Sequence, residues 1–464
     1  MVSLSVPALS TLVAAAALLV ANAEEITSLP GVTGGIPFKM HSGYVDVTDD
    51  SDGSRQLFFW FVESEFNPST APVLLWTNGG PGCSGLGGFI SEMGPFVPNA
   101  DGTLGRRDYA WNKLANMLFI EQPAGVGFST GAMDYYDDGM VAGDNANFVA
   151  RWRQRFPDFA GRTLYLTSES YGGHYLPTLA LELVKRGTPN FGGFAVGNPL
   201  TWMPYRDYGQ WGTWAAHQLL PLPLWESYLE NACAPPRLDA RARSGPRFFA
   251  GDVDCPPEDP HCEPNATCVE LEDTFSTLVE AADPYALDFP TCLDGARAAG
   301  RRERHALLSA VSSAPLKAYE PCASDYGAAY LNDPKVRAAI HVSSNATWGE
   351  CSDAVSAAYN FTDAARPMMP VYDEIYARAP HLKVLVYSGD DDSICATMGS
   401  QKWIWSLGRA VLDEWAPRLL DGQLAGYTVK FEGLTFETIH GAGHMCPATQ
   451  PARTFDVLRA FLAS

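Results

Sequence analysis

The sequence predicts an α/β fold in which a largely parallel sheet is covered by helices on both faces. Short apolar runs alternate with longer stretches of helical periodicity on both sides of a cysteine-rich middle segment. The 464 residues, 46% of them apolar, can bury a large core. Alternating strands and helices favour parallel pairing, because each crossover helix returns the chain to the same edge of the sheet.

The elements of the first half follow from periodicity. Phe148, Trp152 and Phe156 recur at the four-residue spacing of a core-facing helix, predicted over 144–156, and Pro157 ends it. Polar, glycine-containing residues at 49–53 indicate a hairpin turn. The predicted strands are short apolar runs, at 57–62, 72–76, 117–120, 164–166 and 191–196.

The composition and the periodicity of the sequence change after about residue 200. Residues 205–230 are aromatic and helical in pattern, and residues 231–322 hold six of the ten cysteines. We therefore predict a disulfide-stapled insertion at 202–322 between two core parts, 24–201 and 323–464. The alternation then resumes with strands at 383–387, 427–431 and 436–439 and helices at 401–407 and 454–462.

The first 23 residues are predicted to be a signal peptide. An apolar core from Leu12 to Val20 precedes the small-x-small site Ala21-Asn-Ala23. No later run reaches the ~18 apolar residues of a membrane span. We therefore expect an exported protein, either secreted or held in a vacuole or lysosome, with disulfides and with glycosylation at the sequons. These sequons begin at Asn265, Asn345 and Asn360.

Charge and motifs exclude several function classes. The net charge of −21 disfavours nucleic acid and anionic membranes as partners. Gly80-x-Gly82-x-x-Gly85 matches a dinucleotide fingerprint, but no acidic residue follows at the ~20-residue offset after a second strand. Asp49 to Gly53 lacks the spacing of a calcium loop. We expect neither a cofactor nor a metal.

The octapeptide Thr167-Ser-Glu-Ser-Tyr-Gly-Gly-His174 joins a predicted strand to a predicted helix. This is the context of a nucleophile elbow, in which a tight turn lifts one side chain, here Ser170, above the sheet edge. The usual leading glycine of G-x-S-x-G is replaced by Ser168. A serine before a helix is also a common N-cap, so this stretch alone does not decide between the two roles.

An α/β-hydrolase fold requires its nucleophile, acid and base in the chain order Ser, Asp or Glu, His. Of the nine histidines, only His440 and His444 follow a plausible acid at a late strand end. We favour His444 because it lies in a glycine-rich loop, whereas His440 continues a strand. The predicted acid is one of the three adjacent residues Asp390, Asp391 and Asp392. The composition of this run does not distinguish between them.

With these motifs in place, the chain resembles the serine carboxypeptidases of the carboxypeptidase Y and cathepsin A type. The resemblance covers nearly the whole chain after residue 23, apart from the insertion. Its motifs are Trp76-Thr-Asn-Gly-Gly-Pro-Gly-Cys-Ser84, Glu92-Met-Gly-Pro95, Gln122-Pro-Ala-Gly-Val-Gly-Phe-Ser129, Glu169-Ser-Tyr-Gly172, Tyr387-Ser-Gly-Asp-Asp-Asp392 and Gly443-His-Met445.

The resemblance implies a role for each catalytic position. Ser170 matches the nucleophile, Asp392 the acid and His444 the base. The backbone N–H groups of Tyr171 and Gly80 would bind the oxyanion. The implied activity is release of C-terminal residues from peptides and proteins at acidic pH; acyl transfer to an alcohol and a non-catalytic binding role are the alternatives. The family also allows a homodimer.

A carboxypeptidase must hold the free carboxylate of its substrate. In the family this falls to the positions of Asn78, Gly79 and Glu169, with Glu92 beside Glu169. Two close carboxyls disfavour double ionisation, so one keeps a proton at acidic pH and can donate a hydrogen bond to a carboxylate.

The resemblance also implies an apolar substrate pocket. Met445 at the position after the base is typical of members that accept apolar leaving residues. The residues placed around the pocket are Trp76, Tyr171, Ile394, Cys395 and Met445.

For the cysteines, the resemblance implies Cys83–Cys351 and Cys292–Cys322. In the insertion we favour nested pairs, Cys233–Cys268 and Cys255–Cys262. Cys395 matches a free thiol near the site, whereas Cys446 has no counterpart, so these two are either bonded to each other or both free.

Overall fold

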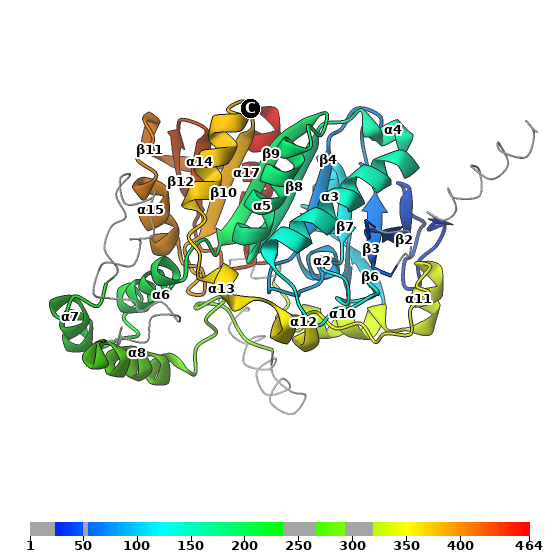
Figure 1. The fold of residues 1–464 in the computed structure, drawn as a ribbon. Coiled ribbons are helices and arrows are strands. Elements are labelled where there is room, and N and C mark those ends of the chain that lie inside the picture. Colours follow the sequence, from blue (N-terminus) through cyan, green and yellow to red (C-terminus); the bar gives the residue numbers. More distant parts are fainter. Residues whose placement is uncertain (1–23, 50–53, 235–264, 293–318) are drawn as a thin grey trace, which may run out of the picture.

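The computed structural model describes residues 24–49, 54–234, 265–292 and 319–464, and its centre is one large sheet (Figure 1). Eleven strands pair in the order β1-β2-β3-β7-β4-β8-β9-β10-β13-β12-β11. Their bounds are β1 Glu24–Glu25, β2 Met40–Asp46, β3 Gln56–Val62, β4 Val73–Thr77, β7 Asn116–Ile120, β8 Leu164–Ser170, β9 Phe191–Pro199, β10 Lys383–Gly389, β11 Val411–Leu420, β12 Gln423–Phe431 and β13 Leu434–Ile439. A separate two-stranded sheet pairs β5 (Phe96–Pro98) with β6 (Leu104–Arg106).

The sheet is parallel in its middle and antiparallel at both sides. β7, β4, β8, β9, β10 and β13 pair in parallel, whereas β1, β2 and β3 on one side and β12 and β11 on the other pair antiparallel. The parallel strands carry near-continuous apolar runs because both of their faces are covered. This arrangement is the predicted α/β-hydrolase fold.

Helices cover both faces of the sheet (Figure 1), and each face has its own apolar cluster. Phe148, Leu176 and Trp403 pack in the first cluster, and Phe89, Tyr330 and Phe461 in the second. The helices are α2 Gly85–Gly87, η2 Gly88–Glu92, η3 Trp111–Lys113, α3 Asp138–Arg155, α4 Pro157–Ala160, α5 Gly172–Lys185, α6 Met203–Ala216, α7 Leu222–Glu230, α8 Ala266–Val279, α10 Ala323–Leu331, α11 Pro334–Ala339, α12 Asp353–Ala358, α13 Phe361–Ala364, α14 Met369–Arg378, α15 Thr397–Ser406, α16 Cys446–Thr449 and α17 Pro451–Ala463.

Several elements differ from the sequence prediction in length. The helix expected from residue 144 begins at Asp138, because Asp137 caps it by accepting a hydrogen bond from the N–H of Met140 at 2.8 Å. The strand expected to end at residue 196 continues to Pro199, and the edge strand β11 was not predicted.

The described part of the insertion has a core of its own. Helices α6, α7 and α8 lie together at one end of the molecule (Figure 1), around Trp211, Tyr228 and Phe275. This separate cluster supports our proposal that residues 202–322 form an insertion between the two core parts.

Disulfides tie the insertion and the core loops. Within the described residues, the bonded pairs are Cys83–Cys351, Cys233–Cys268 and Cys292–Cys322, and Cys395 and Cys446 are buried free thiols. The proposed pair Cys255–Cys262, the signal peptide at 1–23 and the tip of the turn at 50–53 lie outside the described residues. Across the described ranges, no helix is long and apolar enough to cross a membrane.

Candidate active site

The predicted nucleophile lies at the junction of β8 and α5. Ser170 is the last residue of β8 and has φ of 60°. This left-handed conformation costs a non-glycine residue about 1–3 kcal/mol and is concentrated at functional sites. The N-cap of α5 is Tyr171, so Ser170 does not take the capping role that the sequence left open. The strand, turn and helix of a nucleophile elbow are all present.

The unusual Ser168 is accommodated by the glycine that opens α5. A Cβ atom at Gly172 would lie 2.1 Å from Ser168 Oγ and 2.5 Å from Ser168 Cβ. At Gly173 it would lie 2.1 Å from the carbonyl oxygen of Leu200. The serine therefore occupies space that is available only because residue 172 has no side chain.

This contact predicts a non-additive pair of substitutions. Gly172→Ala is expected to lower the free energy of unfolding by about 1–3 kcal/mol, the usual range for overpacking a buried site. In a Ser168→Gly background most of that loss should disappear, because both colliding atoms are gone. Denaturant unfolding of the wild type, the two single variants and the double variant measures the coupling. Equal losses in both backgrounds would contradict the explanation.

The predicted acid and the predicted base are in direct contact. His444 Nδ1 lies 2.8 Å from Asp392 Oδ2, and both side chains are buried. Asp392 Oδ2 also accepts hydrogen bonds from Asn198 Nδ2 at 2.7 Å and from the N–H of Cys395 at 3.2 Å, while its Oδ1 accepts from the N–H of Ile394 at 2.7 Å. This carboxylate is therefore held in one orientation towards the imidazole.

Asn198 was not identified from the sequence. Its Oδ1 accepts hydrogen bonds from the N–H of Gly389 at 3.1 Å and from Cys446 Sγ at 3.1 Å. Because Oδ1 of Asn198 faces these two donors, its Nδ2 points towards Asp392. Because Asn198 precedes the acid by 194 positions, no local sequence signal pairs them.

The other two aspartates of the run have different partners. Asp390 Oδ2 lies 2.8 Å from Nδ1 of His440, in a pair that is largely open to solvent. Asp391 is buried, and its Oδ2 accepts a hydrogen bond from the N–H of Asp288 at 3.1 Å. Burial raises the pKa of Asp391 to about 6. Only Asp392 contacts His444, which favours it among the three.

The glycine-rich loop after β4 packs directly on the elbow. A Cβ atom at Gly79 would lie 2.5 Å from the backbone nitrogen of Tyr171 and 2.8 Å from Ser170 Cβ. Gly80 has φ of 115°, a conformation that L side chains rarely adopt. The backbone of this loop therefore lies against Tyr171, one of the two predicted oxyanion donors, and the loop itself contains the other, Gly80.

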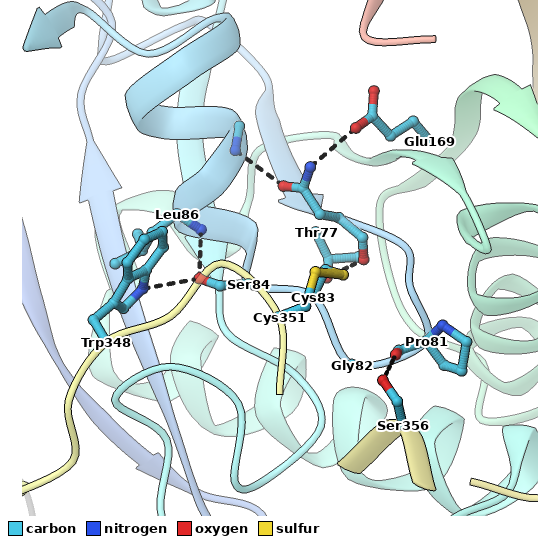
Figure 2. Close-up of a disulfide and its surroundings, with 12 residues drawn as sticks. Thr77, Pro81, Gly82, Cys83, Ser84, Leu86, Glu169, Trp348, Cys351 and Ser356 are labelled. Atoms are coloured by element: carbon cyan, nitrogen blue, oxygen red, sulfur yellow. Dashed lines mark hydrogen bonds between the residues drawn. A yellow bond between two sulfur atoms is a disulfide. The ribbon is translucent and has the colours of Figure 1, made fainter. Parts of the chain in front are cut away.

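Figure 2 shows how the far end of this loop is fixed. Cys83 is bonded to Cys351, and Ser356 Oγ donates a hydrogen bond to the carbonyl oxygen of Pro81 at 2.7 Å. Ser84 Oγ accepts from the N–H of Leu86 at 3.1 Å and from Trp348 Nε1 at 3.3 Å. One segment far away in the sequence, residues 348–356, thereby holds the far end of the loop in place.

A buried carboxyl pair lies beside the predicted nucleophile. Asn78 Nδ2 donates to Glu169 Oε1 at 3.0 Å and to Glu92 Oε1 at 3.1 Å. Burial raises the pKa of Glu92 to about 7. Burial and then the charge of Glu92 hold the pKa of Glu169 well above its usual range. At acidic pH this pair therefore keeps its protons and can donate hydrogen bonds.

A third carboxyl, Glu350, was missed in the sequence. Its negative charge contributes to the raised pKa values of both Glu92 and Glu169, and burial raises its own pKa. Glu350 immediately precedes Cys351, so the disulfide to Cys83 brings it to the site. Only the pairing of these cysteines could have indicated it.

The predicted pocket residues fall into two groups. Ile394 and Met445 are partly exposed and available to a substrate. Trp76, Tyr171 and Cys395 are buried. Trp76 Nε1 donates to Asn78 Oδ1 at 2.8 Å, so this buried ring orients the amide that is predicted to bind the substrate carboxylate instead of lining an open pocket.

Behind Tyr171 lies a polar cluster that the sequence did not reveal. Asp138 Oδ1 accepts hydrogen bonds from the hydroxyls of Tyr171 at 3.1 Å and Tyr359 at 2.7 Å. Its Oδ2 lies 3.0 Å from Nδ1 of His174. This buried cluster fixes the side chain of Tyr171, which follows the predicted nucleophile.

With this geometry established, the comparisons with known proteins identify the family. The sequence model described as serine carboxypeptidase matches residues 30–464. The chain belongs to the serine carboxypeptidase family. Serine carboxypeptidase-like 26 of Arabidopsis thaliana is 35% identical over 456 residues, covering 95% of this chain and 92% of the relative. Serine carboxypeptidase 24 of the same plant is 33% identical over 461 residues, with the same two coverages.

A similar solved structure supports the fold. The crystal structure of Kex1(delta)p, a prohormone-processing carboxypeptidase from Saccharomyces cerevisiae, matches with a TM-score of 0.69 over 91% of each chain. At 20% identity this similarity establishes the shared α/β-hydrolase architecture. The predicted family and fold class are therefore confirmed.

Proposed function

We propose that this family member is a serine-type carboxypeptidase that releases C-terminal residues from peptides and proteins at acidic pH. The observation that carries the proposal is the buried pair of Glu169 and Glu92, held by Asn78 directly beside the elbow of Ser170. A hydrolase that cleaves within chains has no use for proton-bearing carboxyls at this position. A free substrate carboxylate can accept their hydrogen bonds.

The proposed reaction follows the serine triad. His444 takes the proton of Ser170 as Oγ attacks the scissile carbonyl, and Asp392 keeps the imidazole in the tautomer with its proton on Nδ1. The backbone N–H groups of Tyr171 and Gly80 stabilise the oxyanion. His444 then protonates the leaving amine, and water hydrolyses the acyl-enzyme by the same steps in reverse order.

The substrate end is placed by the groups around Asn78. Its amide, the backbone at Gly79 and the protonated Glu169 would bind the terminal carboxylate. Met445 and Ile394 would contact the side chains on either side of the scissile bond, which favours apolar residues. Because one methylene changes binding by only ~1–3 kcal/mol, we expect broad specificity.

A labelling and product assay tests this function. At about pH 5, a fluorophosphonate should label the wild-type protein but not Ser170→Ala, and an N-blocked dipeptide should release its C-terminal amino acid. The C-terminal amide of the same dipeptide should react more slowly. Labelling without amino-acid release, together with acyl transfer from an acyl-glucose ester to an alcohol, would favour an acyltransferase. Absence of labelling would favour a non-catalytic binding role.

We also propose that the protein passes through the secretory pathway and is then secreted or retained in a vacuole or lysosome. The three disulfides support this, because such bonds form and persist in oxidising compartments.

A further inference from the structure

A short segment of the insertion, residues 283–289, contacts the loop that carries the base. We call this segment the strap. The N–H of His444 donates a hydrogen bond to the carbonyl oxygen of Tyr285 at 2.6 Å. The ring of Tyr285 also meets the imidazole edge-on, with centroids 5.2 Å apart and an interplanar angle of 76°. Both the backbone and the ring of the base are therefore in contact with the strap.

The same strap contacts the acid loop on both sides of Asp392. The carbonyl oxygen of Pro284 accepts hydrogen bonds from the N–H of Ser393 at 3.0 Å and from its Oγ at 2.7 Å. Asp391 accepts at its carbonyl oxygen from the N–H of Leu287 at 3.2 Å and at Oδ2 from the N–H of Asp288 at 3.1 Å. The residues before and after the acid are thus fixed to one short segment.

Close packing limits movement between the strap and the base loop. Ala286 is fully buried, and a Cβ atom at Gly443 would lie 2.6 Å from the carbonyl oxygen of Tyr285 and 2.7 Å from Ala286 Cβ. Beyond the strap, Cys292 is bonded to Cys322, at the start of α10. The strap is therefore anchored to the core after it has crossed both catalytic loops.

We propose that the strap positions the base relative to the acid, with Tyr285 as its main positioning residue. Three of the hydrogen bonds between the strap and these two loops involve only main-chain atoms and hold the loops in place, and the ring of Tyr285 adds a contact with the imidazole itself. Triad chemistry is sensitive to such constraints: a misplacement of about 1 Å can cost a factor of ~100 in rate. The insertion thus takes part in catalysis through His444 and Asp392.

The first test replaces the ring that contacts the imidazole. Tyr285→Ala should lower kcat at least about tenfold while KM for the blocked dipeptide changes less than about twofold. The rate of fluorophosphonate labelling should fall by a similar factor. Tyr285→Phe keeps the ring and should restore both rates. A raised KM with unchanged labelling would overturn the proposal, because Tyr285 would then act on the substrate.

The second test releases the anchor without altering the strap. The double variant Cys292→Ser, Cys322→Ser should slow labelling, whereas Cys233→Ser, Cys268→Ser, which opens a disulfide elsewhere in the insertion, should slow it less. Melting temperatures of the four proteins, including wild type and Tyr285→Ala, identify any general loss of folding. Equal labelling rates in both double variants, together with an unaffected Tyr285→Ala, would contradict a positioning role.

This inference rests on the proposed function only through the triad. Fluorophosphonate labelling needs Ser170 and His444 but no peptide carboxylate, so it reports the strap's effect even if the natural substrate is an ester. Failure of peptide hydrolysis with normal labelling would therefore reject the carboxypeptidase and leave the strap open to measurement. Normal hydrolysis with strap variants that label at the wild-type rate would reject the strap alone.

Discussion

Asp392→Asn is expected to lower kcat by about 10⁴-fold, the loss known for the same change in a serine-protease triad. Asp392 accepts the Nδ1–H of His444 at 2.8 Å and two backbone N–H groups besides. An asparagine would offer its NH₂ group to some of these donors, which favours the imidazole tautomer with its proton on Nε2. That tautomer does not accept the proton of Ser170. Steady-state hydrolysis of a blocked dipeptide at pH 5 measures the loss.

The same loop provides a matched control. Asp390 also lies 2.8 Å from a histidine Nδ1, that of His440, but this pair is largely exposed. Asp390→Asn should therefore change kcat less than about twofold, since exposed ion pairs contribute little. Comparable losses in the two variants would mean that the run acts through its overall charge, and the assignment of Asp392 as the acid would be wrong.

The central fold could be predicted because its signals are local. The strands beside the elbow are buried on both faces and read as continuous apolar runs, and the core-facing helices repeat at a spacing of three and four. β11 carries no such signal: most side chains of Val411–Leu420 are exposed, and it is an edge strand defined by pairing with β12. The early start of α3 depends on the cap by Asp137, which lies seven residues before the predicted start at residue 144.

Only those site residues could be predicted that lie in a recognisable motif or follow the expected chain order of nucleophile, acid and base. Ser170 and His444 stand out because each has a distinctive neighbourhood in the sequence. The three adjacent aspartates have no such distinctive neighbourhood. Asp392 differs from the other two in the folded chain, because its carboxylate accepts hydrogen bonds from the amide of Asn198 and from the N–H of Ile394. Glu350 and Tyr285 come from segments with no motif, and each reaches the site through a tertiary contact. Such contacts are properties of the folded chain.

The second large effect concerns pH and the substrate carboxylate. We expect KM for a blocked dipeptide to rise about tenfold between pH 6 and 8, as for a single group that must be protonated for binding. Burial raises the pKa of Glu92 to about 7, and burial and then the charge of Glu92 hold the pKa of Glu169 well above its usual range. Below pH 7 the pair is protonated and donates to the carboxylate. Above pH 7 it gains a negative charge that repels the carboxylate, so KM must rise with pH.

Three controls locate this dependence in the pair. KM for the corresponding dipeptide amide, which has no carboxylate, should change less than about threefold over the same range. Glu92→Gln keeps an acceptor for Asn78 Nδ2 but cannot ionise, and should flatten the profile of the acid substrate near pH 7.

Glu437, on β13, has a pKa raised to about 7 by burial and forms an ion pair with Arg418 at 2.9 Å. Because Glu437 does not contact Asn78, Glu437→Gln should leave the wild-type profile unchanged. Parallel profiles for the acid and amide substrates would instead place the titrating group in the triad, and the carboxyl pair would then have no part in recognising the chain end.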